Sequence, residues 1–192
     1  MRILSIDGGG VRGLIPGAVI VEIEKRTGKP ISQLFDLVSG TSAGGHIALA
    51  LATPGDDGKP KWSAEELAAY YREAYGRIFD NSGFKVFDAL KGLTNERYSA
   101  DGIDSALNEV FGEVKLSEAL IEVLITAFEV ESGKPHFFLR SEARNDPKKD
   151  HLMSFAARAT SAAPTYFEPA AKFNGEEGRA FLDGALFANN PS

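Results

Sequence analysis

Two short apolar segments near the amino terminus each end in a glycine-rich turn and continue into a helix. In "RILSIDGGGVRG" the residues 3–6 are expected to form a buried strand, and a helix over 15–27 follows. In "FDLVSGTSAGGHIALALAT" a strand over 35–40 leads through a tight turn into a helix over 46–53. A repeated strand, turn and helix is typical of an α/β fold, because each helix returns the chain to the start of the next strand.

The rest of the chain continues this alternation. Ser63, followed three residues later by Glu66, is a capping-box signature for a helix. Further helices are expected over 64–79, 103–111 and 154–163, a hairpin over 123–130 and 136–142, and a late strand over 179–182. We therefore predict one domain, residues 1–192, with a layered, mainly parallel central sheet flanked by helices.

The composition excludes several classes of protein. Lys and Arg number 21 against 27 Asp and Glu, a net charge of −6, and no basic cluster could neutralise a nucleic-acid backbone. The absence of cysteine excludes thiol nucleophiles and Cys-ligated zinc. The first residues lack the apolar region of a signal peptide, and no apolar run of about 18 residues follows. We expect a cytoplasmic protein without a transmembrane segment and without a nucleic-acid partner.

The segment "GTSAG", Gly40 to Gly44, matches the pattern G-x-S-x-G. In this pattern a serine lies on a sharp turn between a strand and a helix, and the flanking small residues make room for the backbone to bend. The predicted strand before and apolar helix after Ser42 are the context that such a nucleophile requires. The alternative interpretation is that Ser42 only caps the helix.

A serine nucleophile needs a base within hydrogen-bond reach. The three histidines are His46, His136 and His151, and none follows a late acid in the order serine, acid, histidine. Asp183, at the end of the late strand, could act directly as the base, because functional groups gather where parallel strands end. The alternative interpretation of Asp183 is an Asx-type turn residue.

The glycines Gly8, Gly10 and Gly13 have the spacing G-x-G-x-x-G, which also occurs in dinucleotide-binding turns. Backbone N–H groups in such a loop suit an oxyanion as well as a phosphate. Asp7 precedes the glycines directly, and no acidic residue stands about 20 positions on, at the end of a second strand. Both details weigh against a nucleotide, although a nucleotide- or phosphate-binding module remains the alternative function.

Four motifs together resemble those of the patatin-like phospholipases, a family of lipid acyl hydrolases. They span nearly the whole chain in the family's order: "DGGGVRG", "GTSAGG", "RATSAAPTYFEP" and "DGALFANNP". Family members continue beyond the last motif, so the resemblance implies a domain that lacks its carboxyl-terminal part. A catalytically weak scaffold is a further alternative for such a chain.

The resemblance implies a Ser-Asp dyad that cleaves carboxylic esters of lipids. Ser42 matches the nucleophile and Asp183 the acid, while Gly8, Gly9 and Gly10 match the loop that supplies oxyanion-hole N–H groups. The remaining motif positions are Asp7, Arg12, Gly13, Gly40, Gly44 and Gly184. The family's mechanism implies a lipid acyl ester as substrate and neither a cofactor nor a metal.

Three further expectations concern how the chain meets its substrate. A transient contact with a membrane surface is compatible with a lipid substrate. The apolar segment 80–93 is either a cap that contacts acyl chains or a satellite of the core under a long loop. Tyr166, Phe167 and Phe173 are expected in the core rather than in an acyl pocket.

Overall fold

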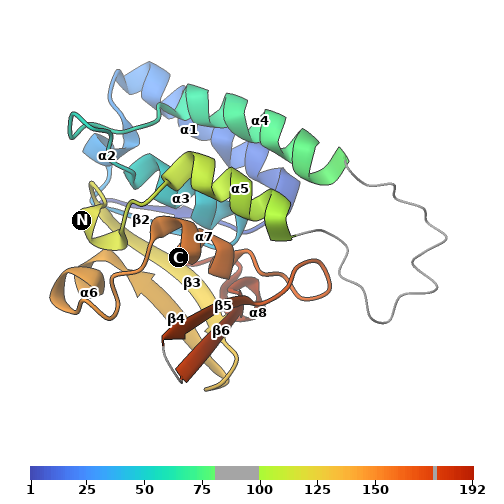
Figure 1. Ribbon diagram of the computed structural model, residues 1–192. Helices are drawn as coiled ribbons and strands as arrows, with labels where there is room; N and C mark the ends of the chain where they lie inside the picture. Colours follow the sequence, from blue (N-terminus) through green and yellow to red (C-terminus); the bar gives the residue numbers. More distant parts are fainter. Residues whose placement is uncertain (81–99, 175–176) are drawn as a thin grey trace.

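A six-stranded mixed sheet with flanking helices forms the centre of the computed structural model, which describes residues 1–80, 100–174 and 177–192. The strands are β1 (Ile3–Ile6), β2 (Leu37–Gly40), β3 (Glu122–Glu129), β4 (Lys134–Leu139), β5 (Ala170–Asn174) and β6 (Glu177–Asp183). The helices are α1 (Leu14–Thr27), α2 (Ile31–Leu34), α3 (Ala43–Ala52), α4 (Ala64–Asp80), α5 (Ala100–Phe111), α6 (Arg140–Asn145), α7 (Met153–Thr160) and α8 (Ala185–Ala188). In Figure 1, α1, α3, α4 and α5 gather above the sheet.

Local signals set several helix ends as expected. α1 ends where Gly28 adopts a left-handed conformation with φ 65°, which glycine accommodates without steric cost. α4 begins at a reciprocal cap: the Glu66 carboxylate accepts from the N–H of Ser63, and the Ser63 hydroxyl accepts from the N–H of Glu66. The two predicted amino-terminal strands are present as β1 and β2.

Helix α3 lies at the centre of the core. All ten of its residues are buried, which explains why its sequence "AGGHIALALA" has no polar face. The helix packs against β1, β2 and β3 on one side and approaches α4 and α7 on others. The start of α3, next to Ser42, is therefore held by packing from several directions.

The register of the sheet places two strand ends against one another. β2 pairs in parallel with β3, from Leu37↔Glu122 to Gly40↔Ile125, and β6 pairs antiparallel with β3, from Phe181↔Glu129 to Asp183↔Ala127. β4 pairs with β3 along both stretches, so β4 occupies one edge of β3 while β2 and β6 share the other. The ends of β2 and β6 thus meet along β3 with Thr126 between them.

Strand directions agree with the expected mainly parallel sheet. β1, β2 and β3 are parallel, and β5, antiparallel to β6, points the same way, so four of the six described strands share one direction. The expectation that Asp183 ends a parallel strand is wrong. Asp183 ends β6, which is antiparallel to β3, so β6 approaches Ser42 from the direction opposite to β2.

Some boundaries also differ from expectation. The residues "RSE" of the expected second hairpin strand begin α6, where the Glu122 carboxylate accepts from the backbone and hydroxyl of Ser141. Strand β5 and helix α8 were not predicted. Of the apolar segment 80–93, all residues after Asp80 lie outside the described part of the structure.

Candidate active site

A cavity of about 800 Å³ joins the residues that the motifs singled out. Ser42, Asp183, Gly9, Gly10 and Arg12 all line it. The remaining wall is largely apolar and comes from α4, α5 and the segment after α7, with Tyr70, Tyr71, Ala74, Ile103, Ala106, Leu107, Val110, Ala163, Tyr166 and Phe167. Phe167 packs against the core as expected and also lines this cavity, whereas Tyr166, likewise expected in the core, is 43% exposed and lines the cavity. The side chain of Phe173, the third of these residues, lies outside the described part of the structure.

The backbone at Ser42 forms the sharp turn that the pattern predicts. Ser42 has φ 54° and ψ −125°, a conformation that non-glycine residues rarely adopt. A Cβ at Gly40 would overlap the backbone of Gly44, and a Cβ at Gly44 would overlap the carbonyl of Ile6. The two glycines therefore permit β1, the turn and α3 to approach closely. The Ser42 N–H donates to Thr160 Oγ1 at 2.9 Å.

Asp183 is buried beside Ser42. The Ser42 side chain lies close enough to the Asp183 carboxyl to lower its pKa, and Asp183 Oδ1 accepts from the N–H of Ala185 at 2.8 Å. Only 4% of the residue is exposed. Burial raises the pKa of the Asp183 carboxyl above its ordinary value, and the Ala185 N–H and the Ser42 side chain offset part of this effect. A carboxylate with a raised pKa is a better proton acceptor near neutral pH.

A pair of buried threonines fills the gap between the two strand ends. The Thr41 hydroxyl donates to the carbonyl of Ala188 at 2.7 Å, so the Thr126 hydroxyl is the donor in its 2.7 Å bond with Thr41. A Cβ at Gly184 would overlap the Thr126 side chain. Gly184 thus lets the chain after Asp183 pass directly over β3.

The glycine loop is tied to the segment after α8. The N–H of Gly8 donates to the Asn189 carbonyl at 3.0 Å, and Asn189 Nδ2 donates to the Gly8 carbonyl at 3.2 Å. Gly8 does not line the cavity, whereas Gly9 and Gly10 do. This geometry differs from the expected role of Gly8, because its N–H is already engaged by Asn189. Gly13 is buried at the end of the 3-10 turn Gly10–Gly13.

Asp7 and Arg12 differ in their position relative to the cavity. Both are exposed, but only Arg12 lines the cavity. Within the residues that the structure describes, no ion pair joins Arg12 to Asp7. The backbone carbonyl of Asp7 lies next to Gly44, so Asp7 contributes to the packing of β1 against α3.

Of the three histidines, only His46 lines the cavity that contains Ser42 and Asp183. His46 is buried on α3, and its Nε2 lies 3.0 Å from the carbonyl of Ala157 on α7. Burial lowers the pKa of His46 to about 4, so the ring is neutral at physiological pH and Nε2 donates to that carbonyl. His136 and His151 line a second cavity.

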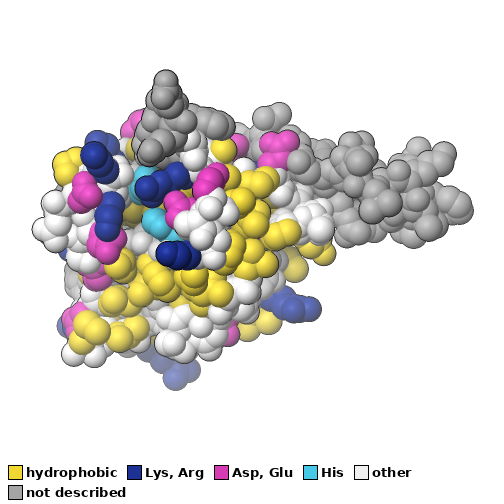
Figure 2. All heavy atoms as spheres, turned by 90° about the horizontal axis from the view of Figure 1, so that it is seen from below, with side chains coloured by type: hydrophobic (Ala, Val, Ile, Leu, Met, Phe, Trp, Pro, Cys, Tyr) yellow, Lys and Arg dark blue, Asp and Glu magenta, His cyan; other side chains and the backbone are white. Residues whose placement is uncertain are grey.

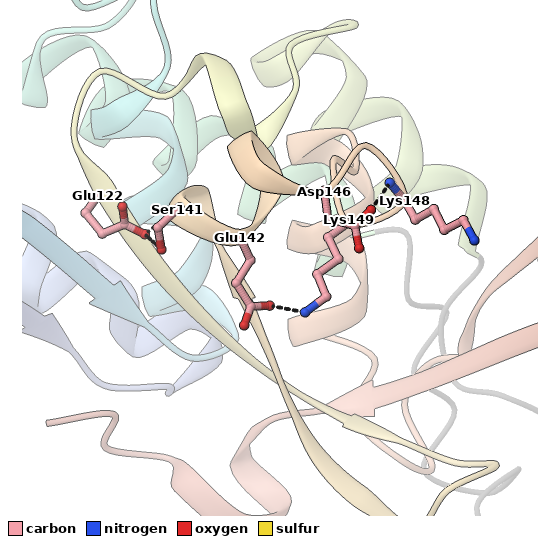
Figure 3. Close-up of polar contacts among 6 residues, drawn as sticks. All are labelled: Glu122, Ser141, Glu142, Asp146, Lys148 and Lys149. Atoms are coloured by element: carbon pink, nitrogen blue, oxygen red, sulfur yellow. Dashed lines mark hydrogen bonds and ion pairs between the residues drawn. The ribbon is translucent and has the colours of Figure 1, made fainter.

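This second cavity, of about 480 Å³, is bordered by β4, α6 and β6. Figure 2, seen from below, shows histidine side chains among basic and acidic ones, beside an apolar surface. Most of these charges have partners. Lys149 and Glu142 form an ion pair (Figure 3), with Lys149 Nζ 2.9 Å from Glu142 Oε2, and Arg179 Nε lies 3.4 Å from Glu129 Oε1. The Glu122 carboxylate accepts a hydrogen bond from the Ser141 hydroxyl, and the Asp146 carboxylate accepts one from the backbone N–H of Lys148 (Figure 3). These groups brace the loop around α6.

Among the described residues, no three His, Asp or Glu side chains gather in a way that could hold a metal ion. None of the described helices combines the length and apolar character needed to cross a membrane.

Sequence reasoning missed three residues that support the site. Thr160 and Asn189 contact the backbone of Ser42 and Gly8, and Thr126 lies between the strand ends. Thr160 and Asn189 belong to the motifs "RATSAAPTYFEP" and "DGALFANNP", which was the available signal for them. Nothing in the local sequence of β3 singles out Thr126.

Comparison with known proteins agrees with these motifs. A family model described as "Patatin-like phospholipase" matches residues 4–192. "Patatin-like protein 2" of Oryza sativa subsp. indica is 36% identical over all of this chain and 51% of its own length. "Probable inactive patatin-3-Kuras 1" of Solanum tuberosum is 31% identical over 88% of this chain and 45% of its own length. A crystal structure of VipD from Legionella pneumophila aligns with 99% of this chain and 46% of VipD, at 15% identity and a TM-score of 0.48.

The chain spans about half the length of the curated relatives that it matches. The match of the family model nevertheless runs almost from end to end, through both glycine-rich turns and the Asp183 segment. The chain therefore belongs to the patatin-like phospholipase family.

Proposed function

We propose that this chain carries the catalytic site of a lipid acyl hydrolase, in which Ser42 is the nucleophile and Asp183 its base. The observation that carries the proposal is that Ser42 and Asp183 line the same cavity with an apolar wall, with the Ser42 side chain near enough to influence the pKa of the Asp183 carboxyl. An apolar wall suits an acyl chain better than a nucleotide, which weighs against the nucleotide-binding alternative. Membership of the family supports the same reaction class.

The proposed reaction has two steps. In the first, Asp183 accepts the Ser42 hydroxyl proton while Oγ attacks the ester carbonyl, and the same proton then passes to the leaving alcohol as the C–O bond breaks. In the second, Asp183 accepts a proton from water, which attacks the acyl-serine; the proton returns to Ser42 Oγ and the fatty acid leaves. We assign the oxyanion to the N–H groups of Gly9 and Gly10, because these glycines line the cavity.

The substrate is proposed to be a carboxylic ester with a long acyl chain. Apolar side chains from α4 and α5 form the wall on which such a chain would lie. The charged side chains among the described lining residues are Arg12, Arg72 and Asp183. The reaction itself requires neither a metal nor a cofactor.

The proposal includes a transient contact with a lipid surface. Val11 lines the cavity and is 55% exposed, and Ile15 and Val19 follow at intervals of four residues, 67% and 57% exposed. Ile15 and Val19, four residues apart on α1, share one face of that helix, and Val11 lies in the 3-10 turn that precedes it, so we propose these three exposed apolar side chains as a stripe for the lipid surface. Replacing Ile15 and Val19 by lysine is expected to weaken sedimentation with zwitterionic vesicles and leave hydrolysis of a soluble short ester unchanged. Unchanged sedimentation would show that this stripe does not contact the lipid surface.

A serine-reactive fluorophosphonate probe tests the nucleophile. We expect the purified wild-type protein to be labelled, Ser42→Ala to be unlabelled, and Asp183→Asn to be labelled far more slowly. His151→Ala is the control, because His151 lines the second cavity and should leave labelling unchanged. Equal labelling of wild type and Ser42→Ala would contradict the proposal, and loss of activity in His151→Ala would point to a histidine base.

A further inference from the structure

We propose that Thr160 is a positioning residue for the reaction, because the segment Thr160–Ala162 sets the location of Ser42 relative to Asp183. This inference rests on the proposed function, in which the two side chains act as a pair. It assigns a task to the motif "RATSAAPTYFEP", which neither the nucleophile, the base nor the glycine loop uses.

The segment binds the backbone of both members of the pair. Thr160 Oγ1 accepts from the N–H of Ser42 at 2.9 Å, and the carbonyl of Ala162 accepts from the N–H of Asp183 at 3.1 Å. Ser42 and Asp183 lie at the ends of different strands, far apart in the sequence, so no local geometry relates them. Two hydrogen bonds from three consecutive residues provide that relation.

The segment is itself held in place. Thr160 and Ala162 are fully buried, and the Ser161 hydroxyl donates to the Ala157 carbonyl at 2.8 Å. Helix α7, whose last residue is Thr160, is fixed to α5 by Arg158, whose Nε lies 3.1 Å from Asp104 Oδ1. The segment therefore has little freedom to follow movements of either strand end.

The close approach of α3 to Thr160 depends on a missing side chain. A Cβ at Gly45 would lie 2.8 Å from Thr160 Cγ2, closer than side chains approach one another. Glycine at this position lets the turn at Ser42 come within hydrogen-bond distance of the threonine hydroxyl. Gly45 and Thr160 thus form one contact between α3 and α7.

The bond to Thr160 restrains the unusual conformation of the nucleophile. With φ 54°, Ser42 is in a sparsely populated backbone region, and such a conformation persists only where its surroundings hold it. Loss of the bond frees the Ser42 N–H and permits the turn to relax, which moves Oγ relative to the Asp183 carboxylate. A misplacement of about 1 Å can cost on the order of 100-fold in rate.

The test compares two substitutions of one residue. Thr160→Val keeps the shape and removes the acceptor, and we expect kcat for a soluble short-chain ester to fall about 10- to 100-fold with KM within about twofold. Thr160→Ser keeps the hydroxyl and should retain most of kcat. Thr53→Val is the matched control, because Thr53 is also fully buried but lies at the far end of α3, where its hydroxyl bonds the Leu49 carbonyl.

A second readout does not depend on catalysis. Hydrogen exchange at the Ser42 amide should accelerate in Thr160→Val and remain slow in Thr160→Ser and Thr53→Val. Wild-type kcat or unchanged exchange in Thr160→Val would overturn the inference, as would an equal loss of kcat in Thr53→Val or in Thr160→Ser. If the wild-type protein neither hydrolysed esters nor reacted with the probe, the proposed function would be overturned, and with it the role of Thr160 in the reaction. The exchange rates would still show whether Thr160 holds the turn at Ser42.

Discussion

Burial determines the ionisation of two residues in the centre of the molecule, Asp183 and His46. Their pKa values move in opposite directions, upward for the acid and downward for the base, because burial disfavours the charged form of each. Each shift makes the free energy of unfolding depend on pH, with its own sign. Single substitutions can therefore separate the two contributions.

We predict that Asp183→Asn stabilises the protein at neutral pH. Since the folded-state pKa of Asp183 is raised, its contribution to stability is fully present below the unfolded-state pKa and is lost as the pH rises through the folded-state value. The Asn side chain carries no charge and can still accept from the Ala185 N–H. The melting temperature of Asp183→Asn minus that of wild type, measured between pH 4 and 8, should increase with pH. A difference that does not vary with pH would contradict the prediction.

We predict the opposite slope for His46. Its folded-state pKa of about 4 lies below its ordinary value of 6.5, so the unfolded chain takes up a proton first and stability falls as the pH drops from about 6.5 to 4. The full effect is worth up to about 3 kcal/mol. His46→Gln, which keeps a donor for the Ala157 carbonyl but does not titrate, should lose much less stability over this range in urea unfolding. An equal loss in the variant would exclude His46 as the cause.

At the residue scale, the sequence singles out the proposed nucleophile and base more readily than the residues that contact their backbone. Ser42 and Asp183 stand in motifs whose chemistry is local, so each is recognisable within a few residues. Thr160 and Asn189 act through hydrogen bonds to backbone atoms more than 100 positions away. Sequence alone places them in motifs but does not show which atoms they contact, and the engagement of the Gly8 N–H by Asn189 was equally hidden.

At the scale of elements, the cap of α4 allows a direct test. Ser63→Ala removes the hydroxyl that accepts from the Glu66 N–H and is expected to cost about 1 kcal/mol, or roughly 2–4 °C in melting temperature. Ser132→Ala is the control, because Ser132 bonds Glu129 in a turn and caps no helix. Calorimetry should show a clear loss only for Ser63→Ala. Equal losses in both variants would mean that the cap contributes nothing specific.

The sequence predicts elements whose ends are marked by nearby residues, such as caps and glycines. It does not predict elements that form only through contacts with residues distant in the sequence. The cap at Ser63 and the glycine at the end of α1 are encoded within one helical turn. Strand β5 exists through its pairing with β6, and the start of α6 is set by Glu122, which is distant in sequence. The antiparallel direction of β6 follows from its pairing with β3, which no local pattern records.

At the scale of the whole molecule, the cavity draws its wall from several elements, and its size should select the acyl chain. Ala106 on α5 lines the cavity with a small side chain. Ala106→Phe is expected to reduce kcat/KM for a dodecanoyl ester about 10-fold or more, with the value for a butanoyl ester within about twofold. The adjacent Ser105→Phe is the control, because Ser105 is exposed and does not line the cavity. A uniform loss across chain lengths would contradict an acyl-binding role.

The end-to-end arrangement of β2 and β6 along β3 also bears on biosynthesis. A ribosome adds about 5–20 residues per second, so Ser42 emerges about 7–30 s before Asp183. During that interval the nascent chain has the serine but lacks the strand that delivers the carboxylate. Chemistry that needs the pair must therefore wait until β6 has been synthesised and has joined β3 from the opposite direction.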